Sequence, residues 1–298
     1  MAEPLRVGVI GCGAIATAVH LRVLRALPGA RVTAVADPSP EARERAGRLA
    51  PGAALHAGAG ELLARSDVDA VVVTAPSGLH AELALATLAS GRHLYLEKPI
   101  ATTLADGERV AAAARAAGVV AAVGFNWRFQ PLVARARELV RAGTIGELRA
   151  ASSVFCEPAR LPAWKQRRAD GGGVLLDLGS HHFDLIRWLL DAEVAGVEAT
   201  LRSEASEQDV ASVELTMADG REASCVFSFR APQAHALELV GERGVLRIDR
   251  TARTLTLRGA RARVATPELV AWRARSLVRP RTEPSWARAL SAFVAATA

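Results

Sequence analysis

The residues best suited to acid–base chemistry lie in one stretch, GGGVLLDLGSHHFDLIRWLL, at residues 171–190. Asp177, His181 and Asp184 are spaced i, i+4 and i+7, which places all three on one face of an α-helix. A carboxylate beside an imidazole can orient the ring, so we interpret His181 as a general acid or base and Asp177 as its partner. His182 points elsewhere on such a helix. The alternative is a solvated polar face, which the flanking Leu, Phe and Trp residues disfavour.

The same stretch carries a second stripe, formed by Leu178, Leu185 and Leu189, which predicts that the helix packs against a sheet. The loop before it, ARLPAWKQRRADGGG, is rich in basic groups and contains Trp164, whose flat ring suits a sugar. Its cations could hold a carboxylate or phosphate, or could be solvated: Arg160, Lys165, Arg167 and Arg168.

A second candidate site opens the chain. The strand-like RVGVIG leads into Gly11-x-Gly13-x-x-Ala16 and then a helix, which is the pattern of a dinucleotide-binding turn. Gly11 permits a tight turn, and Gly13 lets the backbone approach a pyrophosphate at the helix N-terminus. We assign Ala14 and Ile15, which begin that helix, to the same cofactor site.

A second strand pattern, RVTAVAD, ends at Asp37, where a carboxylate can accept hydrogen bonds from the ribose hydroxyls of adenosine. The same charge would repel a 2′-phosphate, which predicts NAD as the cofactor. Ser39 and Arg43 could hold a phosphate, so NADP stays open as an alternative. Asp37 could also serve only as a helix cap before Pro38.

Strand and helix patterns alternate through the first half, which predicts an α/β domain at 1–124, a doubly wound (Rossmann) parallel sheet. Ligands of such sheets lie outside the strand carboxyl ends. Those ends carry the polar or rigid residues Thr74, Pro76, Glu97, Lys98 and Asn126. We interpret Lys98 as a cation that stabilises an alkoxide near a nicotinamide, with a surface lysine as the alternative. The Lys98–Pro99 bond is a candidate cis peptide.

Strand patterns follow one another without helices after residue 193, which predicts a largely antiparallel open sheet in an α+β domain at 125–298. The outer face of this sheet would otherwise be exposed to solvent, so we expect it to pack against another subunit in a homodimer or homotetramer. The last pattern, SWARALSAFVAATA, predicts a helix with an exposed apolar strip around Leu290 and Phe293, to be covered by a partner.

Composition excludes several classes. The chain has 298 residues, of which 50% are hydrophobic, and no apolar run of transmembrane length, so we expect a globular cytoplasmic protein without a membrane partner. Its beginning indicates a short tail and a strand instead of a signal peptide. Cys12, Cys156 and Cys225 have no metal-ligand spacing and are expected to be free thiols, with no metal bound. The net charge is +6, but the Arg-rich region 247–281 lacks interleaved aromatics, so we expect no nucleic-acid partner.

Taken together, the motifs resemble the glucose-fructose oxidoreductase, inositol dehydrogenase and rhizopine-catabolism (Gfo/Idh/MocA) family. The matching elements are the glycine turn at 11–16, TAPSGLH at 74–80, EKP at 97–99, GFNWRFQP at 124–131 and GGGVLLDLGSHHFD at 171–184. The resemblance implies NAD(P)-dependent oxidation or reduction of a sugar, cyclitol or related polyol. It places Lys98, Asp177 and His181 at the family's catalytic positions. It also implies that the cofactor is lined by Thr74, Pro76, His80, Glu97 and Asn126.

The mechanism expected from this resemblance is hydride transfer between nicotinamide and a carbinol carbon. His181 accepts the hydroxyl proton in oxidation and donates it in reduction, and Lys98 stabilises the alkoxide. Asp184 is expected to orient a neighbouring group and to take no direct part in the reaction. The substrate is expected to contact Arg128, Trp164, Asp177 and His181. A glycosidase that uses NAD for a transient oxidation, and a sugar sensor without chemistry, are the alternatives. The family pattern further implies a loop and helix beyond the helix at 286–298.

Overall fold

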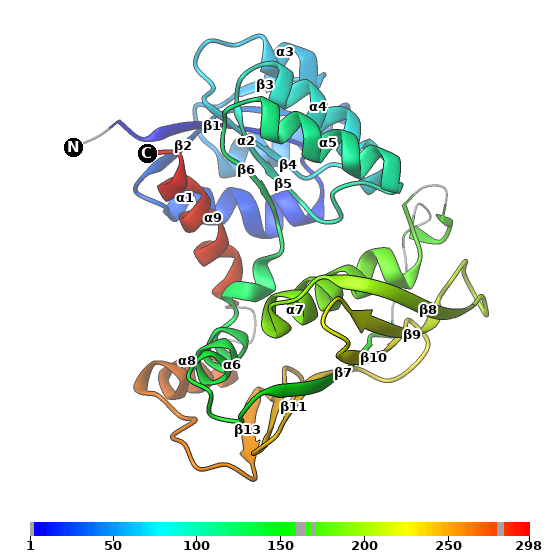
Figure 1. The fold of residues 1–298 in the computed structure, drawn as a ribbon. Helices are drawn as coiled ribbons and strands as arrows, with labels where there is room; N and C mark the ends of the chain where they lie inside the picture. Colours follow the sequence, from blue (N-terminus) through cyan, green and yellow to red (C-terminus); the bar gives the residue numbers. More distant parts are fainter. Residues whose placement is uncertain (1–2, 159–161, 163–164, 169–170, 279–282) are drawn as a thin grey trace. The chain divides into compact units, whose positions relative to one another are not determined.

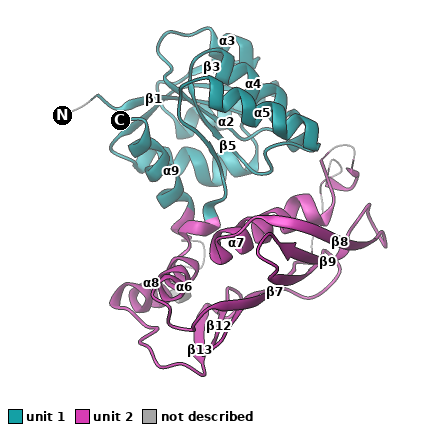
Figure 2. Ribbon diagram, in the orientation of Figure 1, with its two compact units in different colours: residues 1–126, 286–298 teal, residues 127–285 magenta. Residues whose placement is uncertain are grey.

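The computed structural model describes residues 3–158, 162, 165–168, 171–278 and 283–298 (Figure 1). The chain forms two compact units, residues 1–126 with 286–298 and residues 127–285 (Figure 2). The predicted boundary after residue 124 lies close to the first change of unit. The final helix, however, belongs with the first unit and not with the second, where the sequence predicts it.

The sheet of the first unit is parallel throughout. Its six strands follow the order β3-β2-β1-β4-β5-β6, which is the order of a dinucleotide-binding doubly wound sheet. The strand order reverses between β1 and β4, so the carboxyl ends of these strands flank the point where such sheets bind ligands. The strands are β1 (Leu5–Ile10), β2 (Ala30–Ala36), β3 (Ala54–His56), β4 (Ala70–Val73), β5 (His93–Leu96) and β6 (Ala121–Val123). The predicted fold class is confirmed.

Apolar residues fill both faces of this sheet, as expected for parallel strands covered on two sides. Along β4, Ala70 and Val72 belong to one buried cluster, whereas Val71 and Val73 belong to the other. Two of the connecting helices start at side-chain caps: Ser39 accepts a hydrogen bond from the N–H of Ala42 at the start of α2, and Thr103 accepts one from the N–H of Asp106 at the start of α5. The helical segments are η1 (Ala16–His20), α1 (Leu21–Ala26), α2 (Pro40–Leu49), α3 (Ala59–Leu63), η2 (Ser77–Leu79), α4 (His80–Ala89) and α5 (Leu104–Ala116).

The last helix, α9 (Ser285–Ala296), completes the core of the first unit (Figure 1). Leu290 is 0% exposed and Phe293 is 4% exposed, in one cluster with the inward-facing valines of β1. The ring of Phe293 meets that of Tyr95 edge to face, with centroids 5.6 Å apart. The predicted exposed strip is therefore wrong, because the chain's own first unit covers these two residues.

We expect Leu290→Ala to lower the free energy of unfolding of the first unit by about 2–5 kcal/mol, because it leaves a cavity in a closed core. Urea unfolding followed by circular dichroism measures the change. Leu104→Ala is the matched control, since Leu104 is 79% exposed and its truncation should cost no more than about 0.5 kcal/mol. Equal small effects of both substitutions would contradict the packing of α9.

The sheet of the second unit has seven strands in the order β13-β12-β11-β7-β10-β9-β8. Strands β7 and β10 run parallel, and every other neighbouring pair is antiparallel, so the predicted largely antiparallel sheet is confirmed. The strands are β7 (Leu148–Cys156), β8 (Val194–Arg202), β9 (Val210–Met217), β10 (Glu222–Ser228), β11 (Ala234–Gly241), β12 (Val245–Asp249) and β13 (Thr254–Arg258).

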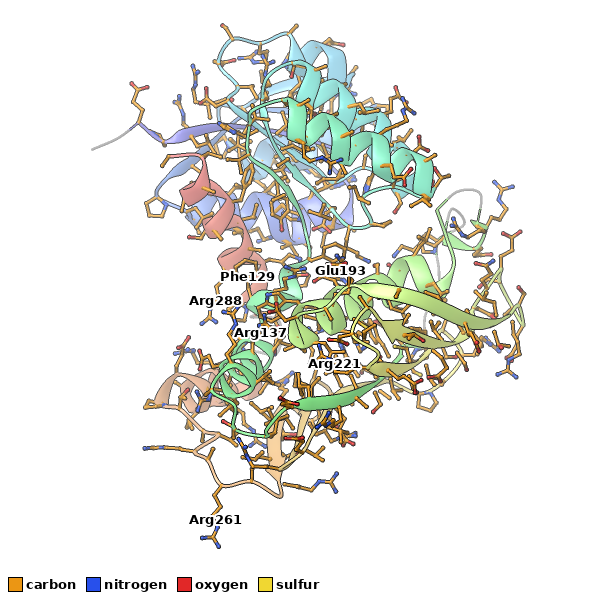
Figure 3. All side chains as sticks on the ribbon, viewed as in Figure 1. Phe129, Arg137, Glu193, Arg221, Arg261 and Arg288 are labelled. Atoms are coloured by element: carbon orange, nitrogen blue, oxygen red, sulfur yellow. The ribbon has the colours of Figure 1, made fainter. Side chains whose placement is uncertain are left out.

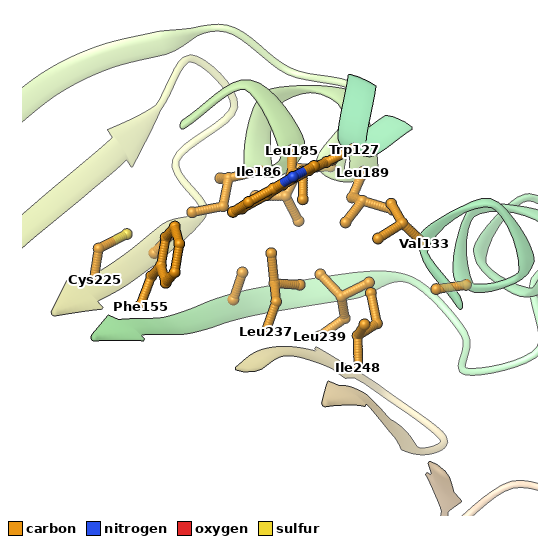
Figure 4. Packing of buried hydrophobic residues seen from close by; sticks show 14 of the residues in the cluster. Trp127, Val133, Phe155, Leu185, Ile186, Leu189, Cys225, Leu237, Leu239 and Ile248 are labelled. Carbon is orange, nitrogen blue, oxygen red and sulfur yellow. The ribbon is translucent and has the colours of Figure 1, made fainter. Parts of the chain in front are cut away.

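Helices of the second unit pack on one face of this sheet. Leu178, Leu185 and Leu189 are at most 5% exposed, which confirms the predicted leucine stripe. Figure 4 shows Leu185 and Leu189 above the strand that carries Leu237. The helical segments are η3 (Asn126–Phe129), α6 (Pro131–Arg141), η6 (Leu175–Gly179), α7 (Ser180–Leu190) and α8 (Pro267–Val278).

Helix α8 has no counterpart among the predicted elements. The Arg-rich region around it alternates in the manner of a strand, so its sequence does not indicate a helix clearly. The start signals of the helix are Pro267 and Glu268, in its first turn. Trp272 is buried and belongs to the core of the second unit. Arg261, in contrast, projects away from the ribbon (Figure 3) and is exposed.

Two guanidinium groups fix the C-terminal end of α7 (Figure 3). Arg137 donates a hydrogen bond to the carbonyl of Leu189 over 2.9 Å, and Arg221 donates one to the carbonyl of Leu190 over 2.7 Å. Cations at this end also interact favourably with the helix dipole. The helix that carries His181 is thus held at its far end as well as along its apolar face.

Candidate active site

The glycine turn joins β1 to the helix that begins at Ala14. Gly11 has a φ of +90°, and a Cβ there would lie 2.6 Å from the main-chain nitrogen of Ala75, so only glycine fits. At Gly13 no described atom lies within 4 Å of the Cβ position, so the space beside its backbone is open. The first N–H groups of a helix have no preceding carbonyl to bond. A pyrophosphate therefore fits this turn.

Thr74 supports the glycine turn, and its place beside the cofactor stays a prediction. Its hydroxyl donates to the carbonyl of Gly11 over 2.6 Å, and the residue is 6% exposed. Thr74 thus holds the glycine turn against the end of β4. Pro76, two residues later, is exposed just before η2, whereas Asn126 is buried at the start of η3.

Asp37 braces the turn from the end of β2. One carboxylate oxygen accepts the N–H of Cys12 over 2.7 Å, and the other accepts the N–H of Ser39 over 2.9 Å. Ser39, not Asp37, caps α2, so the simple helix-cap interpretation of Asp37 is wrong. The carboxylate is only half-buried and has lone pairs left for ribose hydroxyls.

Glu97 and Lys98 follow β5 directly. The Nε2 of His20 lies 2.6 Å from Oε1 of Glu97, and His20 is 0% exposed. The N–H of Lys98 donates to the other oxygen of Glu97 over 3.2 Å. Burial disfavours the carboxylate, but the hydrogen bond and charge of His20 outweigh it, together with the charge of Lys98 and its N–H, so the pKa of Glu97 lies below its ordinary value.

The Lys98–Pro99 peptide bond, a candidate cis bond in the sequence, is cis in the structure. His80 is 1% exposed, and its Nδ1 and Nε2 lie 2.6 and 2.9 Å from the carbonyl oxygens of Pro99 and Ala75. Both ring nitrogens face main-chain carbonyls of the first unit. That this ring lines the cofactor stays a prediction. The imidazole links the segment after β4 to the segment after β5.

In the second unit, three glycines let the preceding loop pass over the start of the helix region. A Cβ on Gly172 would lie 2.2 Å from the carbonyl oxygen of Lys165, and Gly171 and Gly173 have φ values of +92° and +97°. The N–H of Gly172 donates to the carbonyl of Arg167 over 2.9 Å. These glycines are therefore required by close approach and by backbone conformation.

This approach brings Lys165 to Asp177, whose Oδ2 accepts from the ammonium over 2.7 Å. The sequence offers Lys165 only as one of four loop cations and does not predict this pair. Asp177 lies in the π-helical segment η6, and the α-helix begins only at Ser180. The predicted single α-helix face is thus wrong, because a π turn holds more residues than an α turn and changes the directions of the side chains.

Asp184 has a different partner. Nε of Arg128 donates to Oδ2 of Asp184 over 2.8 Å, and the second guanidinium nitrogen bonds the other oxygen. Burial raises the pKa of Asp184 above its ordinary value, although the bonds and charge of Arg128 act against this rise. Arg128 is thus paired with Asp184 of α7. Its contact with substrate, and the orienting role of Asp184, stay predictions.

His181 and His182 lie in different surroundings. His181 is 8% exposed and stacks on Trp127, with ring centroids 3.8 Å apart and planes 9° from parallel. His182 is 0% exposed and packs against the rings of Phe155 and Phe227. Burial, with a smaller effect from the charge of Arg250, lowers the pKa of His182 to about 3. His182 is therefore a neutral part of the core at physiological pH.

The sequence does not predict the groups around Trp127. The guanidinium carbon of Arg250 lies 4.0 Å from the centroid of this ring, and the His235 ring lies 4.3 Å from it. Burial lowers the pKa of Arg250 to about 10, and burial with the charge of Arg250 lowers the pKa of His235 well below its ordinary value. These residues come from β11 and the turn after β12, so only tertiary packing reveals them.

Some expectations fall outside what the structure describes. Trp164 and Arg160 lie outside the described residues.

Within the described part of the chain, no group of three or more His, Cys, Asp or Glu side chains is arranged to hold a metal ion. Cys12, Cys156 and Cys225 are buried free thiols, as predicted. No helix among the described residues has both the length and the apolar character needed to cross a membrane.

Two family models match the chain. Residues 5–125 match the oxidoreductase family with an NAD-binding Rossmann fold, and residues 133–247 match the C-terminal domain of the GFO/IDH/MocA family. The first match agrees with the sheet order and the glycine turn described above. The first unit is therefore an NAD-binding Rossmann domain.

Individual relatives extend these matches. The dTDP-3,4-didehydro-2,6-dideoxy-alpha-D-glucose 3-reductase of Streptomyces violaceoruber is 35% identical over 83% of this chain and 73% of its own length. Inositol 2-dehydrogenase of Rhizobium meliloti is 32% identical over 81% of this chain and 74% of its own length. The crystal structure of GenD2 from gentamicin A biosynthesis in complex with NAD is 27% identical, with a TM-score of 0.77, covering 100% of this chain and 94% of that chain. The chain thus belongs to the GFO/IDH/MocA family and is an NAD-binding oxidoreductase.

Proposed function

We propose that the protein transfers a hydride between NAD and a carbinol carbon of a sugar, cyclitol or related polyol. The observation that carries this proposal is Lys98, which follows β5 at the ligand-binding edge of an NAD-binding sheet. Its N–H donates to Glu97, and the carbonyl of the next residue, Pro99, lies 2.6 Å from Nδ1 of His80. The names of the relatives support the substrate class, since one acts on a dTDP-linked sugar and another on inositol.

Each proposed catalytic residue has one task. NAD, when bound, supplies the nicotinamide carbon that accepts the hydride. The ammonium of Lys98 stabilises the alkoxide that forms at the substrate oxygen. The imidazole of His181 accepts the hydroxyl proton during oxidation and returns it during reduction. Asp177, paired with Lys165, binds a neighbouring hydroxyl of the substrate.

A substrate screen tests the proposal. Sugars, cyclitols and nucleotide sugars are supplied with NAD or NADH, and the absorbance of the reduced nicotinamide is followed in both directions. Net turnover of free cofactor supports the dehydrogenase or reductase. Product release without net cofactor turnover would indicate the glycosidase alternative, and binding without turnover of any compound would indicate a sensor.

Asp37 motivates a prediction about cofactor choice. We expect NADH to bind more tightly than NADPH, and Asp37→Ser to reduce this difference by about 10-fold or more, because a like-charge contact with the 2′-phosphate is removed. Fluorescence titration with both cofactors measures the two dissociation constants. Asp67→Ser is the control, since Asp67 precedes β4 at the opposite end of the sheet. Tighter binding of NADPH by the unmodified protein would contradict the prediction.

We also propose that the sheet of the second unit mediates self-association as a homodimer or homotetramer. Strand register places Ser212, Val226, Val154 and Ala236 in one row across four strands, on the face opposite the core. Val226 and Val154 are 42% and 37% exposed, although both are apolar. Light scattering should give an oligomer for the unmodified protein and a smaller species for Val154→Lys. A well-behaved monomer of the unmodified protein would contradict this proposal.

A further inference from the structure

We propose that His20 and His80 are positioning residues that hold the main chain on either side of Lys98, and thereby fix where its ammonium acts. This inference rests on the proposed catalytic role of Lys98. Neither histidine has a reacting role in the proposed mechanism, yet both are almost completely buried within the first unit, at 0% and 1% exposure.

The first contact lies before Lys98. His20 is the last residue of η1, the π-helical segment that follows the glycine turn, and its Nε2 lies 2.6 Å from Oε1 of Glu97. The other oxygen of Glu97 accepts the N–H of Lys98 over 3.2 Å. A Cβ on Gly124 would lie 3.3 Å from the Glu97 carboxyl, so the glycine that directly follows β6 leaves room for this side chain. His20 therefore links the cofactor helix to the backbone of Lys98 through one carboxylate.

The second contact lies after Lys98. Nδ1 of His80 lies 2.6 Å from the carbonyl oxygen of Pro99, and Nε2 lies 2.9 Å from the carbonyl oxygen of Ala75. Ala75 in turn packs against Gly11 of the glycine turn. A neutral imidazole has one N–H and donates to one of these carbonyls, whereas the imidazolium donates to both. In either form His80 lies between the main chain after Lys98 and the segment that would carry the pyrophosphate.

Energetics favour a geometric role over a purely stabilising one. A buried ion pair gains little over well-packed apolar side chains, because two polar groups lose their hydration. Lysine has a flexible stem with considerable rotamer entropy, so its ammonium is placed only as well as its backbone is placed. Misplacement of a reacting group by about 1 Å can lower a rate by about 10²-fold. The rate gained by fixing the backbone of Lys98 can therefore exceed the cost of burying two histidines.

The test is a double-mutant cycle. His20→Leu and His80→Leu are each made in the unmodified protein and in Lys98→Met, and kcat and the dissociation constant for NADH are measured with one substrate from the screen. In the unmodified background we expect kcat to fall by about 10-fold or more, with NADH binding changed far less. In the Lys98→Met background the same substitutions should have almost no further effect, since effects that pass through one residue are not additive. His20→Gln, which retains an N–H donor, should recover most of the lost rate.

His93→Leu is the matched control. His93 lies at the opposite end of β5, where its Nδ1 accepts the N–H of Val120 over 3.0 Å, and its replacement should leave kcat unchanged. Equal losses of kcat in both Lys98 backgrounds would overturn the inference. If His20→Leu does not fold, the paired variant His20→Leu/Glu97→Gln, which leaves no unpaired carboxylate, enters the same cycle.

A second readout does not depend on activity. The chain contains two lysines, Lys98 and Lys165, so trace acetylation followed by peptide mass spectrometry reports Lys98 with Lys165 as the internal reference. We expect the labelling of Lys98 relative to Lys165 to rise in His20→Leu and His80→Leu and to stay constant in His93→Leu. Unchanged labelling in both variants would overturn the inference. If instead Lys98→Met keeps full kcat while labelling changes as expected, the proposed catalytic role of Lys98 fails and its positioning by the histidines stands.

Discussion

We expect His181→Ala to lower kcat/KM for oxidation by about 10²- to 10⁴-fold and to remove the decline of the rate at low pH. A general base must be unprotonated to accept the hydroxyl proton, so the rate of the unmodified enzyme should fall as the pH drops below the pKa of the base. Imidazole groups ordinarily change charge between about pH 5 and 8, so the profiles should cover that range. Loss of the imidazole removes the group that titrates.

Profiles of kcat/KM against pH, measured with one good substrate, check this expectation. His182→Phe is the matched control, because His182 packs against Phe155 and Phe227 and a third phenyl ring suits that cluster. The pKa of His182 is lowered to about 3, so this ring stays neutral above about pH 4 and contributes no decline of the rate near neutrality. A decline that persists in His181→Ala but disappears in His182→Phe would show that the wrong histidine is assigned.

Lys98→Met should lower kcat by about 10²-fold or more while the dissociation constant for NADH changes little. The reason is that the ammonium stabilises the developing alkoxide, whereas methionine occupies a similar volume without the charge. Steady-state kinetics and fluorescence titration separate the two quantities. Lys98→Arg, the companion variant, keeps a positive charge but places it differently, and we expect it to recover only part of the rate.

A Lys98→Met enzyme with nearly normal kcat would mean that the lysine anchors structure or cofactor only. A parallel loss of NADH affinity and kcat would have the same meaning. The kinetic comparison is clean because the backbone on both sides of Lys98 is held by other residues, so substitution of the side chain leaves those contacts in place.

The first unit could be predicted from sequence because its signals are local. The glycine turn, the apolar strands and their polar ends each occupy a few consecutive residues, and parallel topology brings the strand ends to one edge. Asp37 and Lys98 therefore lie where the sequence predicts them, at the ends of β2 and β5. The same local patterns predict the leucine stripe of α7, since burial of an amphipathic helix follows its period.

Contacts between distant segments could not be predicted in this way. Phe293 contacts Tyr95, and Arg250 lies over the ring of Trp127. The residues of each pair are far apart in the sequence, and a periodic pattern of hydrophobic residues predicts only local structure. The pairing of Asp177 with Lys165 depends on a close passage at Gly172 and on a π turn, whereas the prediction assumes regular α-helical spacing. The prediction of one helix face therefore fails because it assumes the wrong local geometry. The partners of Asp177 and Trp127 are missed because they depend on long-range packing.

The return of α9 to the first unit has a consequence for synthesis on the ribosome. The second unit is one uninterrupted segment, 127–285, but the core of the first needs Leu290 and Phe293. The segments 1–126 and 286–298 are separated by about 160 residues, which take roughly 10–30 s to translate at typical rates of about 5–20 residues per second. During that interval the nascent Rossmann sheet exposes the apolar surface that α9 later covers. The domain synthesised first is therefore completed last, and a chaperone that binds apolar surface has its longest access there.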